Sequence, residues 1–278
     1  MSRSPKTEQN QTPVITISDG TLIPQKGDGA VLSAWNIAFF GALIILALLC
    51  LLKPYPYRNI LSFVPDGIVA TLSVTFASIF FALIIGMIAG LGRISRNPVI
   101  NLIATVYVEV VRGIPLLVQL FYIYFGIPQL IDHSPLKGII HLNGPSSAII
   151  AISICYGAYM AEIFRAGIQS LPKGQMEAAL ALGMTRGQAI RTVILPQTVK
   201  VILPPIGNEF IALLKDSSLV SMIAVSDLLR RGKEYASTSF EYFACYTVIA
   251  LIYLIMTLFF SRLIAVMEAK LRHNGTNN

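Results

Sequence analysis

The sequence predicts an all-α integral membrane protein. The chain has 278 residues, of which 55% are hydrophobic and 13% are charged. Soluble globular domains carry about a quarter charged residues, so lipid is the expected solvent for much of this surface. Six apolar stretches are long enough to cross a bilayer, for which a helix needs about 20 residues. The formal net charge of +7 is spread along the chain and forms no basic run, so nucleic acid is not an expected partner.

We expect six membrane spans between two polar tails. Residues 1–33 are rich in polar residues, proline and glycine, which favours a flexible cytoplasmic tail, and no signal peptide is recognised there. Residues 271–278 are expected to form a C-terminal tail. In the second span, Gly86 and Gly90 form a small-xxx-small pattern, which permits close helix contact. The spans are predicted at 34–52, 67–91, 98–127, 146–168, 197–214 and 242–266.

The distribution of Lys and Arg predicts that both termini lie in the cytoplasm. With the N-terminus inside, the inner segments hold 13 of these residues and the outer segments hold 7, and Arg112 lies inside the third span. Lys and Arg concentrate in cytoplasmic loops. The long segment between the fourth and fifth spans is therefore expected to be cytoplasmic too.

This segment, at 170–196, is predicted to contain two short helices. Ser170 is a residue type that caps the start of a helix, and Pro172 suits a first turn, where no amide donor is needed. Strong helix formers fill 176–182. Gly183 suits the left-handed conformation that ends a helix.

A second helix is expected to start at Thr185, because its spacing to Gln188 matches a capping box. Pro196 is expected to end that helix at the entry to the fifth span. The two helices would present a small apolar knob made of Ala178, Ala179, Leu182 and Gly183. From the residues alone, the knob fits equally a surface for another protein and a hairpin resting on lipid headgroups.

The spacing of this loop carries a family resemblance. Glu177, Ala178 and Ala179 precede Gly183 by a fixed interval, and Leu195 and Pro196 follow it. This pattern resembles the EAA loop of importer-type ATP-binding-cassette (ABC) permeases, with Val193 in place of the usual isoleucine. In that family the loop is a pair of coupling helices that sits in a groove of the ATPase subunit.

Three further segments, 108–119, 158–168 and 214–219, resemble the branch of that family for polar amino acids of the histidine, glutamate, glutamine, arginine and opine type. The resemblance covers 63–270 and implies the transmembrane fold of a type I ABC importer. The predicted helix at 34–52 is extra relative to the five-span core of this branch.

Polar residues inside the predicted spans are candidates for a substrate pathway, because such residues are costly in lipid. Glu109 and Arg112 share a helix face, and Gly113 and Pro115 after them predict a bend with a freed backbone carbonyl. This pair is expected to line a cavity, to hold the bend as an ion pair, or both. The other candidates are Glu162, Asn208, Asp216, Ser217 and Ser218.

Two local expectations accompany these candidates. Arg165, three residues after Glu162, is expected to extend to the headgroups. The segment 215–218 is expected to cap a turn at the outer end of the fifth span, although its serines also fit ordinary turn positions. A zwitterionic amino acid needs an anion site and an acceptor for its ammonium group, and a carboxylate such as Glu162 or Asp216 supplies the acceptor.

The resemblance implies the permease subunit of an ATP-driven uptake transporter in the inner (cytoplasmic) membrane. No GxxxxGK[ST] loop is present, so ATP hydrolysis is assigned to a separate ATPase dimer. A second permease subunit, identical or homologous, and a periplasmic or lipoprotein substrate-binding protein are the other expected partners. No enzyme activity, cofactor or metal is expected. A permease for another small polar solute and an ion-coupled secondary transporter are the alternatives, although no internal repeat typical of the latter is found.

Overall fold

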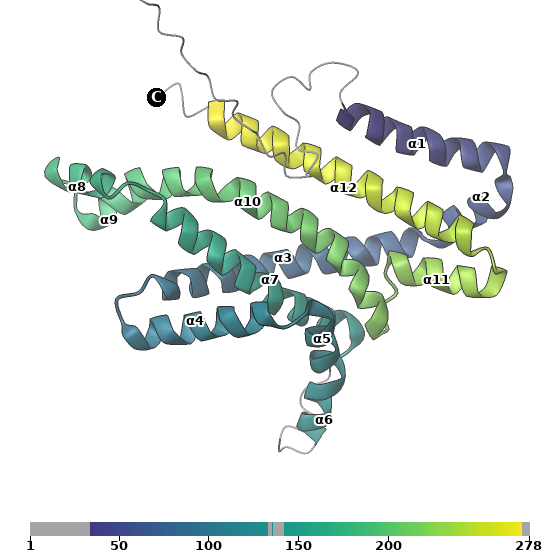
Figure 1. The fold of residues 1–278 in the computed structure, drawn as a ribbon, viewed down its shortest axis with the longest axis horizontal. Coiled ribbons are helices and arrows are strands. Elements are labelled where there is room, and N and C mark those ends of the chain that lie inside the picture. The colour runs from purple at the N-terminus through teal and green to yellow at the C-terminus, as the bar shows by residue number, and fades with distance from the viewer. Residues whose placement is uncertain (1–33, 133–134, 136–141, 274–278) are drawn as a thin grey trace, which may run out of the picture.

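The computed structural model describes residues 34–132, 135 and 142–273, and these ranges are almost entirely helical, without a strand (Figure 1). The N-terminal tail predicted at 1–33 and residues 274–278 lie outside the described residues. The helices are α1 (Ala34–Leu52), α2 (Pro54–Phe63), α3 (Pro65–Arg93), α4 (Pro98–Gly113), α5 (Leu116–Phe121), α6 (Ile127–Asp132), α7 (Gly144–Gln169), α8 (Lys173–Ala181), α9 (Arg186–Ala189), α10 (Leu195–Asp216), α11 (Leu228–Ser239) and α12 (Tyr242–His273). Two π-helical turns, η1 (Tyr122–Gly126) and η2 (Ile190–Ile194), and a 3₁₀ helix, η3 (Ser217–Ile223), join them.

The predicted all-α membrane fold is confirmed for the described residues. Five helical segments are long and apolar enough to cross a membrane, and the bent pair formed by α4 and Leu116–Asp132 makes a sixth if it is one span. The five segments are Ala34–Leu52, Pro65–Arg93, Gly144–Gln169, Arg186–Ile223 and Tyr242–Lys270. The last helix extends to His273, so the predicted tail at 271–278 begins as helix.

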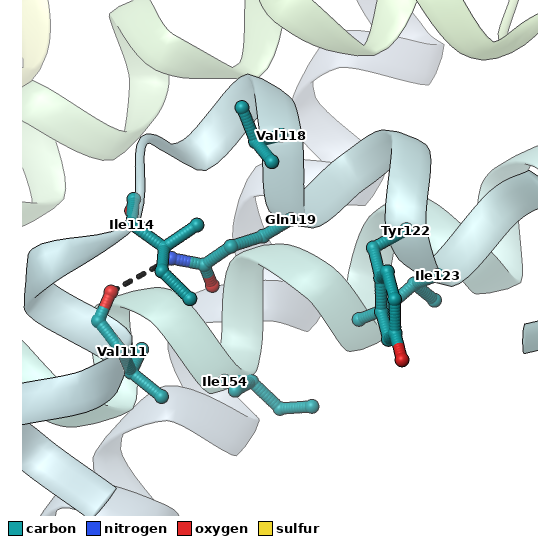
Figure 2. A pocket seen from close by; sticks show the side chains of 7 residues that line it. All are labelled: Val111, Ile114, Val118, Gln119, Tyr122, Ile123 and Ile154. Atoms are coloured by element: carbon teal, nitrogen blue, oxygen red, sulfur yellow. Dashed lines mark hydrogen bonds between the residues drawn. The ribbon is translucent and has the colours of Figure 1, made fainter. Parts of the chain in front are cut away.

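The third predicted span is broken rather than straight. α4 ends at Gly113, and the following helical segment leaves it at 103°. Ile114 has an extended backbone between the two helices, and Pro115 has no amide to donate to the carbonyl of Val111. Figure 2 shows the Gln119 side chain reaching back across this break to Val111. The bend was predicted, but the division of 98–127 into two helices at a steep angle was not.

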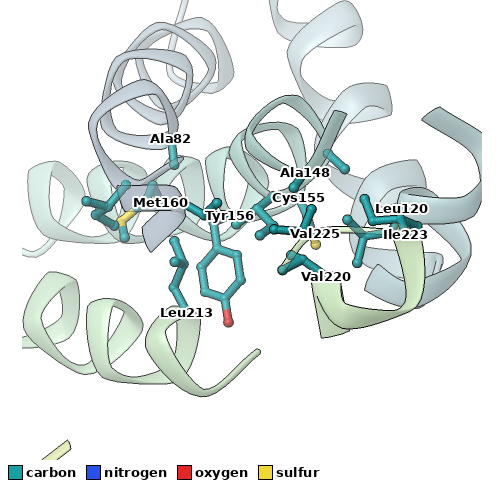
Figure 3. Close-up of a cluster of buried hydrophobic side chains, with 14 residues drawn as sticks. Ala82, Leu120, Ala148, Cys155, Tyr156, Met160, Leu213, Val220, Ile223 and Val225 are labelled. Carbon is teal, nitrogen blue, oxygen red and sulfur yellow. The ribbon is translucent and has the colours of Figure 1, made fainter. Parts of the chain in front are cut away.

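α3 and α7 pack closely at the centre of the structure. A Cβ atom on Gly86 would lie 2.3 Å from Cβ of Met160, and one on Gly90 would lie 2.8 Å from the carbonyl oxygen of Ala161. The predicted close contact at the small-xxx-small pattern is therefore confirmed. Buried side chains from α5, α10 and η3 complete the cluster around Tyr156 (Figure 3).

A second cluster joins the N-terminal helices to the C-terminal ones. Tyr57 of α2 packs in a buried group with Leu228 of α11 and side chains of α12. The indole nitrogen of Trp35 in α1 donates to the Leu258 carbonyl at 3.0 Å, and the Arg262 guanidinium lies 5.3 Å from the centre of the indole ring. The extra helix at 34–52 therefore packs along α12 (Figure 1).

The bundle has two distinct ends in Figure 1. α8, α9, the turn between α3 and α4, and the C-terminal end of α12 lie toward one end, which we call the loop end. α2 and α11 lie at the other, which we call the far end.

Candidate coupling loop and polar pathway

The turn that follows α8 has the predicted glycine geometry. Gly183 has a φ of +82°, in the left-handed region. Its amide donates to the Leu180 carbonyl at 3.0 Å, and the amide of Met184 donates to the Ala179 carbonyl at 3.1 Å. These bonds satisfy carbonyls that the end of a helix leaves free, so the predicted left-handed helix stop is confirmed.

The capping box is confirmed as well. The amide of Gln188 donates to Oγ1 of Thr185 at 3.3 Å, and the amide of Thr185 donates to Oε1 of Gln188 at 2.9 Å. The prediction for Ser170 is wrong. α7 runs on to Gln169, and the Ser170 hydroxyl donates to the Gly167 carbonyl at 2.9 Å, so this serine ends one helix instead of starting another. Pro172 takes the N-cap position of α8, ahead of the first turn.

The second short helix does not stop at Pro196. α9, η2 and α10 form one helical segment that passes through this proline. Just ahead of the proline, the amide of Leu195 reaches back to the Ile190 carbonyl in a π turn. This wider turn lets the ring join the helix without a break, so the predicted proline stop is wrong. The second half of the loop, α9 and η2, is therefore continuous with the fifth span.

The apolar knob is exposed on the surface of the loop end. Leu182 has 81% of its surface exposed, and Ala178 and Gly183 are exposed beside it. Glu177, Leu195 and Pro196 are exposed too. Ala179 was placed in the knob wrongly, because only 4% of its surface is exposed and it faces inward. α8 and α9 project from the body of the bundle, where a second protein can reach them (Figure 1).

The predicted ion pair between Glu109 and Arg112 is not found in the described part of the chain. Glu109 pairs instead with Arg93, at 3.5 Å, and the Arg112 guanidinium lies 5.1 Å from the centre of the Tyr159 ring. The tight turn between α3 and α4 is responsible, because it brings Arg93 alongside both α4 and α7.

Arg93 is a residue that the sequence reasoning counted only as a topology signal. Its guanidinium, 14% exposed, also donates to the Glu162 carboxylate. Arg165 donates to the same carboxylate and, at 2.6 Å, to Oε1 of Gln169. Arg165 thus lies along α7 between Glu162 and Gln169, and its expected extension to the headgroups stays a prediction. Two guanidinium groups pair with Glu162, and the one from Arg93 links α3 to α7.

Polar groups of α7 and α10 meet deeper in the bundle. The Tyr156 hydroxyl donates to Oδ2 of Asp216 at 2.8 Å. Glu209 is partly buried and lies close enough to Arg112 and Asp216 for electrostatic interaction. Asn208 beside it is exposed. Side chains of α4, α7 and α10 therefore form one polar strip.

The serines after Asp216 do not extend this strip equally. Ser217 is buried, and its hydroxyl donates to the Leu214 carbonyl at 2.8 Å, whereas Ser218 is partly exposed. Asp216 precedes η3, yet its side chain makes no capping bond there. The expected cap at 215–218 is therefore found at Ser217, the C-cap of α10, and not at Asp216, and the 3₁₀ helix continues from it.

Gln119 is the residue that the sequence reasoning missed at the break. Its Nε2 donates to the carbonyls of Val111 and Ile114, each at 2.8 Å. Because residue 115 is proline, the Val111 carbonyl has no donor four residues later, and it accepts from the Ile114 amide at 3.4 Å as well as from Gln119. Beside Gln119 is a mostly apolar cavity of about 260 Å³ (Figure 2). The signal was available, since a glutamine four residues after a bend-forming proline can supply the missing donor.

At the far end, the buried Asp227 carboxylate joins α11 to α12. Asp227 accepts hydrogen bonds from the amides of Leu229 and Arg230, which start α11, and from the Tyr253 hydroxyl of α12 at 3.4 Å. The neighbouring amide of Leu228 donates to Oγ1 of Thr71 in α3. Burial raises the pKa of Asp227 from its ordinary value of 3.8 to about 6.

Known proteins resemble this chain over most of its length. Residues 82–273 match the family described as "Binding-protein-dependent transport system inner membrane component". The probable amino-acid permease protein YxeN of Bacillus subtilis is 40% identical over 191 residues, 69% of this chain and 83% of that protein. The glutamine transport system permease protein GlnP of Escherichia coli strain K12 is 36% identical over 207 residues, 74% of this chain and 92% of that protein.

Two solved structures share the fold. The crystal structure of an amino acid ABC transporter with histidines has a TM-score of 0.69 and 40% identity, and the match covers 79% of this chain and 97% of that one. An inward-facing structure of the MetNI methionine ABC transporter has a TM-score of 0.62 at 21% identity, with 78% and 98% covered. With the bundle of spans and the exposed loop, these matches lead to one conclusion: the chain belongs to the family of inner membrane components of binding-protein-dependent transport systems, with the fold of a type I ABC importer permease.

Proposed function

We propose that this chain is the permease subunit of an ATP-driven uptake transporter for polar amino acids. The amino-acid and glutamine permeases among its relatives support this cargo. A separate ATPase dimer hydrolyses ATP, and a binding protein delivers the amino acid from outside. A second permease subunit, identical or homologous, supplies the other half of the pathway.

The observation that carries the proposal is the exposed loop at 170–196. Its knob, Ala178, Leu182 and Gly183, is apolar, projects from the bundle and has no partner within the described residues. A groove in the ATPase is the expected partner, because an apolar tip held on a capped helix suits a protein surface. The excess of Lys and Arg in the segments on this side supports a cytoplasmic loop end, with both termini inside.

The polar strip is the proposed substrate pathway. The exposed Arg112 supplies a cation for the substrate carboxylate, and Glu209 and Asp216 supply acceptors for its ammonium group. Gly113 and Pro115 form the break that ends α4 directly after Arg112. Glu162 acts as an anchor between α3 and α7, since two guanidinium groups already hold it.

ATP-driven closure of the ATPase dimer draws the two coupling loops together and changes which end of the pathway is open. The two states must differ in the exposure of the polar strip, because a ligand shifts only an equilibrium whose states it binds differently.

The test is reconstitution of the permease, its ATPase and its binding protein in proteoliposomes. We expect uptake of a polar amino acid that requires internal ATP, stops with vanadate and continues after ionophores collapse the ion gradients. Uptake that fails with ionophores and persists without ATP would establish the ion-coupled alternative instead. Competition by phosphate or sulfate, but not by glutamine, histidine or arginine, would assign another solute.

A further inference from the structure

The coupling loop and the polar strip belong to one continuous helical segment. Arg186–Ile223 begins in the loop at α9, passes through η2 and ends beyond Asp216. Movement of the loop is therefore transmitted directly along α10 toward Glu209. How that movement reaches Glu209 depends on the stiffness of the helix between these points.

α10 contains two adjacent prolines in its interior, Pro204 and Pro205. In a regular α-helix the amides at these positions would donate to the carbonyls of Lys200 and Val201. Proline has no amide hydrogen, and its ring crowds the carbonyl four residues earlier. The helix is therefore bent at this place, and it is also easier to bend further here than elsewhere. The ribbon of α10 changes direction along its length in Figure 1.

Close contacts hold α10 on both sides of the prolines. On the loop side, a Cβ atom on Gly167 of α7 would lie 2.1 Å from Cγ2 of Ile202. On the far side, the ring of Phe210 packs against Phe76 of α3 and Phe260 of α12, with centroids 5.6 and 5.3 Å apart.

A groove that is open to the surface lies beside the prolines and borders Phe210. Its volume is about 170 Å³, and it is lined by Leu203, Ile206, Gly207 and Phe210 of α10 together with side chains of α3 and α12. Tightly packed interiors rarely leave room for a helix to change its bend. Here the unfilled volume adjoins the segment whose internal hydrogen bonds are missing.

We propose that Pro204 and Pro205 form a hinge through which the coupling loop repositions Glu209 in the pathway. This inference rests on the proposed function, because it assigns positioning residues to the same transport cycle. Glu209 lies one helical turn beyond the hinge, near Arg112 and Asp216. Glu209 and Asp216 lie on the same side of the hinge in α10, so a change in bend moves them together relative to Arg112 of α4.

The test compares two double variants in the reconstituted transporter. Pro204→Ala with Pro205→Ala restores both amide donors and stiffens the helix, whereas Pro204→Gly with Pro205→Gly restores the donors but keeps the flexibility. We expect the alanine variant to bind the ATPase normally and to lose about tenfold in uptake per ATP hydrolysed. The glycine variant should retain most of the wild-type ratio. Pro128→Ala in α6 is the control for loss of a proline elsewhere.

The outcomes separate the hinge from a structural role. Equal losses in the alanine and glycine variants, or wild-type coupling in the alanine variant, would overturn the hinge. Elution as a folded complex by size exclusion is required of each variant. Absence of ATP-dependent uptake by the wild-type complex, assayed in parallel, would contradict the proposed function itself rather than the hinge.

Discussion

The left-handed turn at Gly183 yields a quantitative prediction about ATPase docking. A Cβ atom added to Gly183 would meet nothing within 4 Å, so substitution by alanine creates no steric clash with other parts of the chain. The backbone alone carries the penalty, because a φ of +82° is strained for a residue with a side chain. That strain is about 1–2 kcal/mol. If the loop relaxes out of its docking geometry, the permease should bind the ATPase about 5- to 30-fold more weakly.

Gly187 provides a matched control. It is also exposed with open space around its Cβ position, but it lies in α9 and has no positive φ. Gly187→Ala should therefore bind as wild type, and Gly183→Asn should lose less than Gly183→Ala, since asparagine tolerates the left-handed region better. The assay is titration of the purified ATPase against detergent-solubilised permease. Wild-type affinity for Gly183→Ala, or an equal loss for Gly187→Ala, would refute the reasoning.

Three further predictions concern the break, the pathway and the far end. Gln119→Leu leaves the Ile114 carbonyl without its side-chain donor, while the Val111 carbonyl keeps the Ile114 amide, and it should lower the free energy of unfolding by about 1–3 kcal/mol, read as a fall in Tm in detergent; an unchanged Tm would show that water replaces the amide. Glu209→Gln keeps the shape of the side chain and should raise the KM for uptake at least about tenfold while ATPase binding is unchanged; unaltered kinetics would remove Glu209 from the pathway. Asp227 binds a proton in the folded protein below about pH 6 that the unfolded chain still lacks, so its stability contribution grows as pH falls from about 6 toward 4 and is lost as pH rises through 6. Between pH 7 and pH 5 the free energy of unfolding of wild type should therefore rise by about 1.3 kcal/mol more than that of Asp227→Asn, read as a larger gain in Tm, and equal gains would contradict the raised pKa.

The features that were predicted correctly depend on neighbours in the sequence. The left-handed turn at Gly183 depends only on the backbone freedom of that glycine. The capping box depends only on the three-residue spacing of Thr185 and Gln188, and the bend at Pro115 depends only on the amide hydrogen that proline lacks. The spans follow from length and apolar composition in the same way. The pattern of Gly86 and Gly90 also predicted a contact between helices, because small residues one turn apart favour a close helix partner. The pattern does not identify that partner.

The errors arise where distant parts of the chain meet. Glu109 shares a helix face with Arg112, yet Arg93 reaches it from α3 across a turn that spacing does not describe. Ser170 and Pro196 were assigned to separate short helices, but α7 and α10 extend into the loop from both sides. Gln119 bonds carbonyls five and eight residues away only because the chain folds back at the break.

The central claim is that the loop at 170–196 is a cytoplasmic docking element for an ATPase. The most direct test is labelling of a Leu182→Cys variant with a membrane-impermeant thiol reagent. The unsubstituted chain serves as the blank, since Cys155 and Cys245 are buried and Cys50 is partly buried. We predict labelling in inside-out vesicles stripped of ATPase, protection when the ATPase is added back, and no labelling in right-side-out vesicles. Labelling from the outside, or undiminished labelling in the presence of bound ATPase, would contradict the claim.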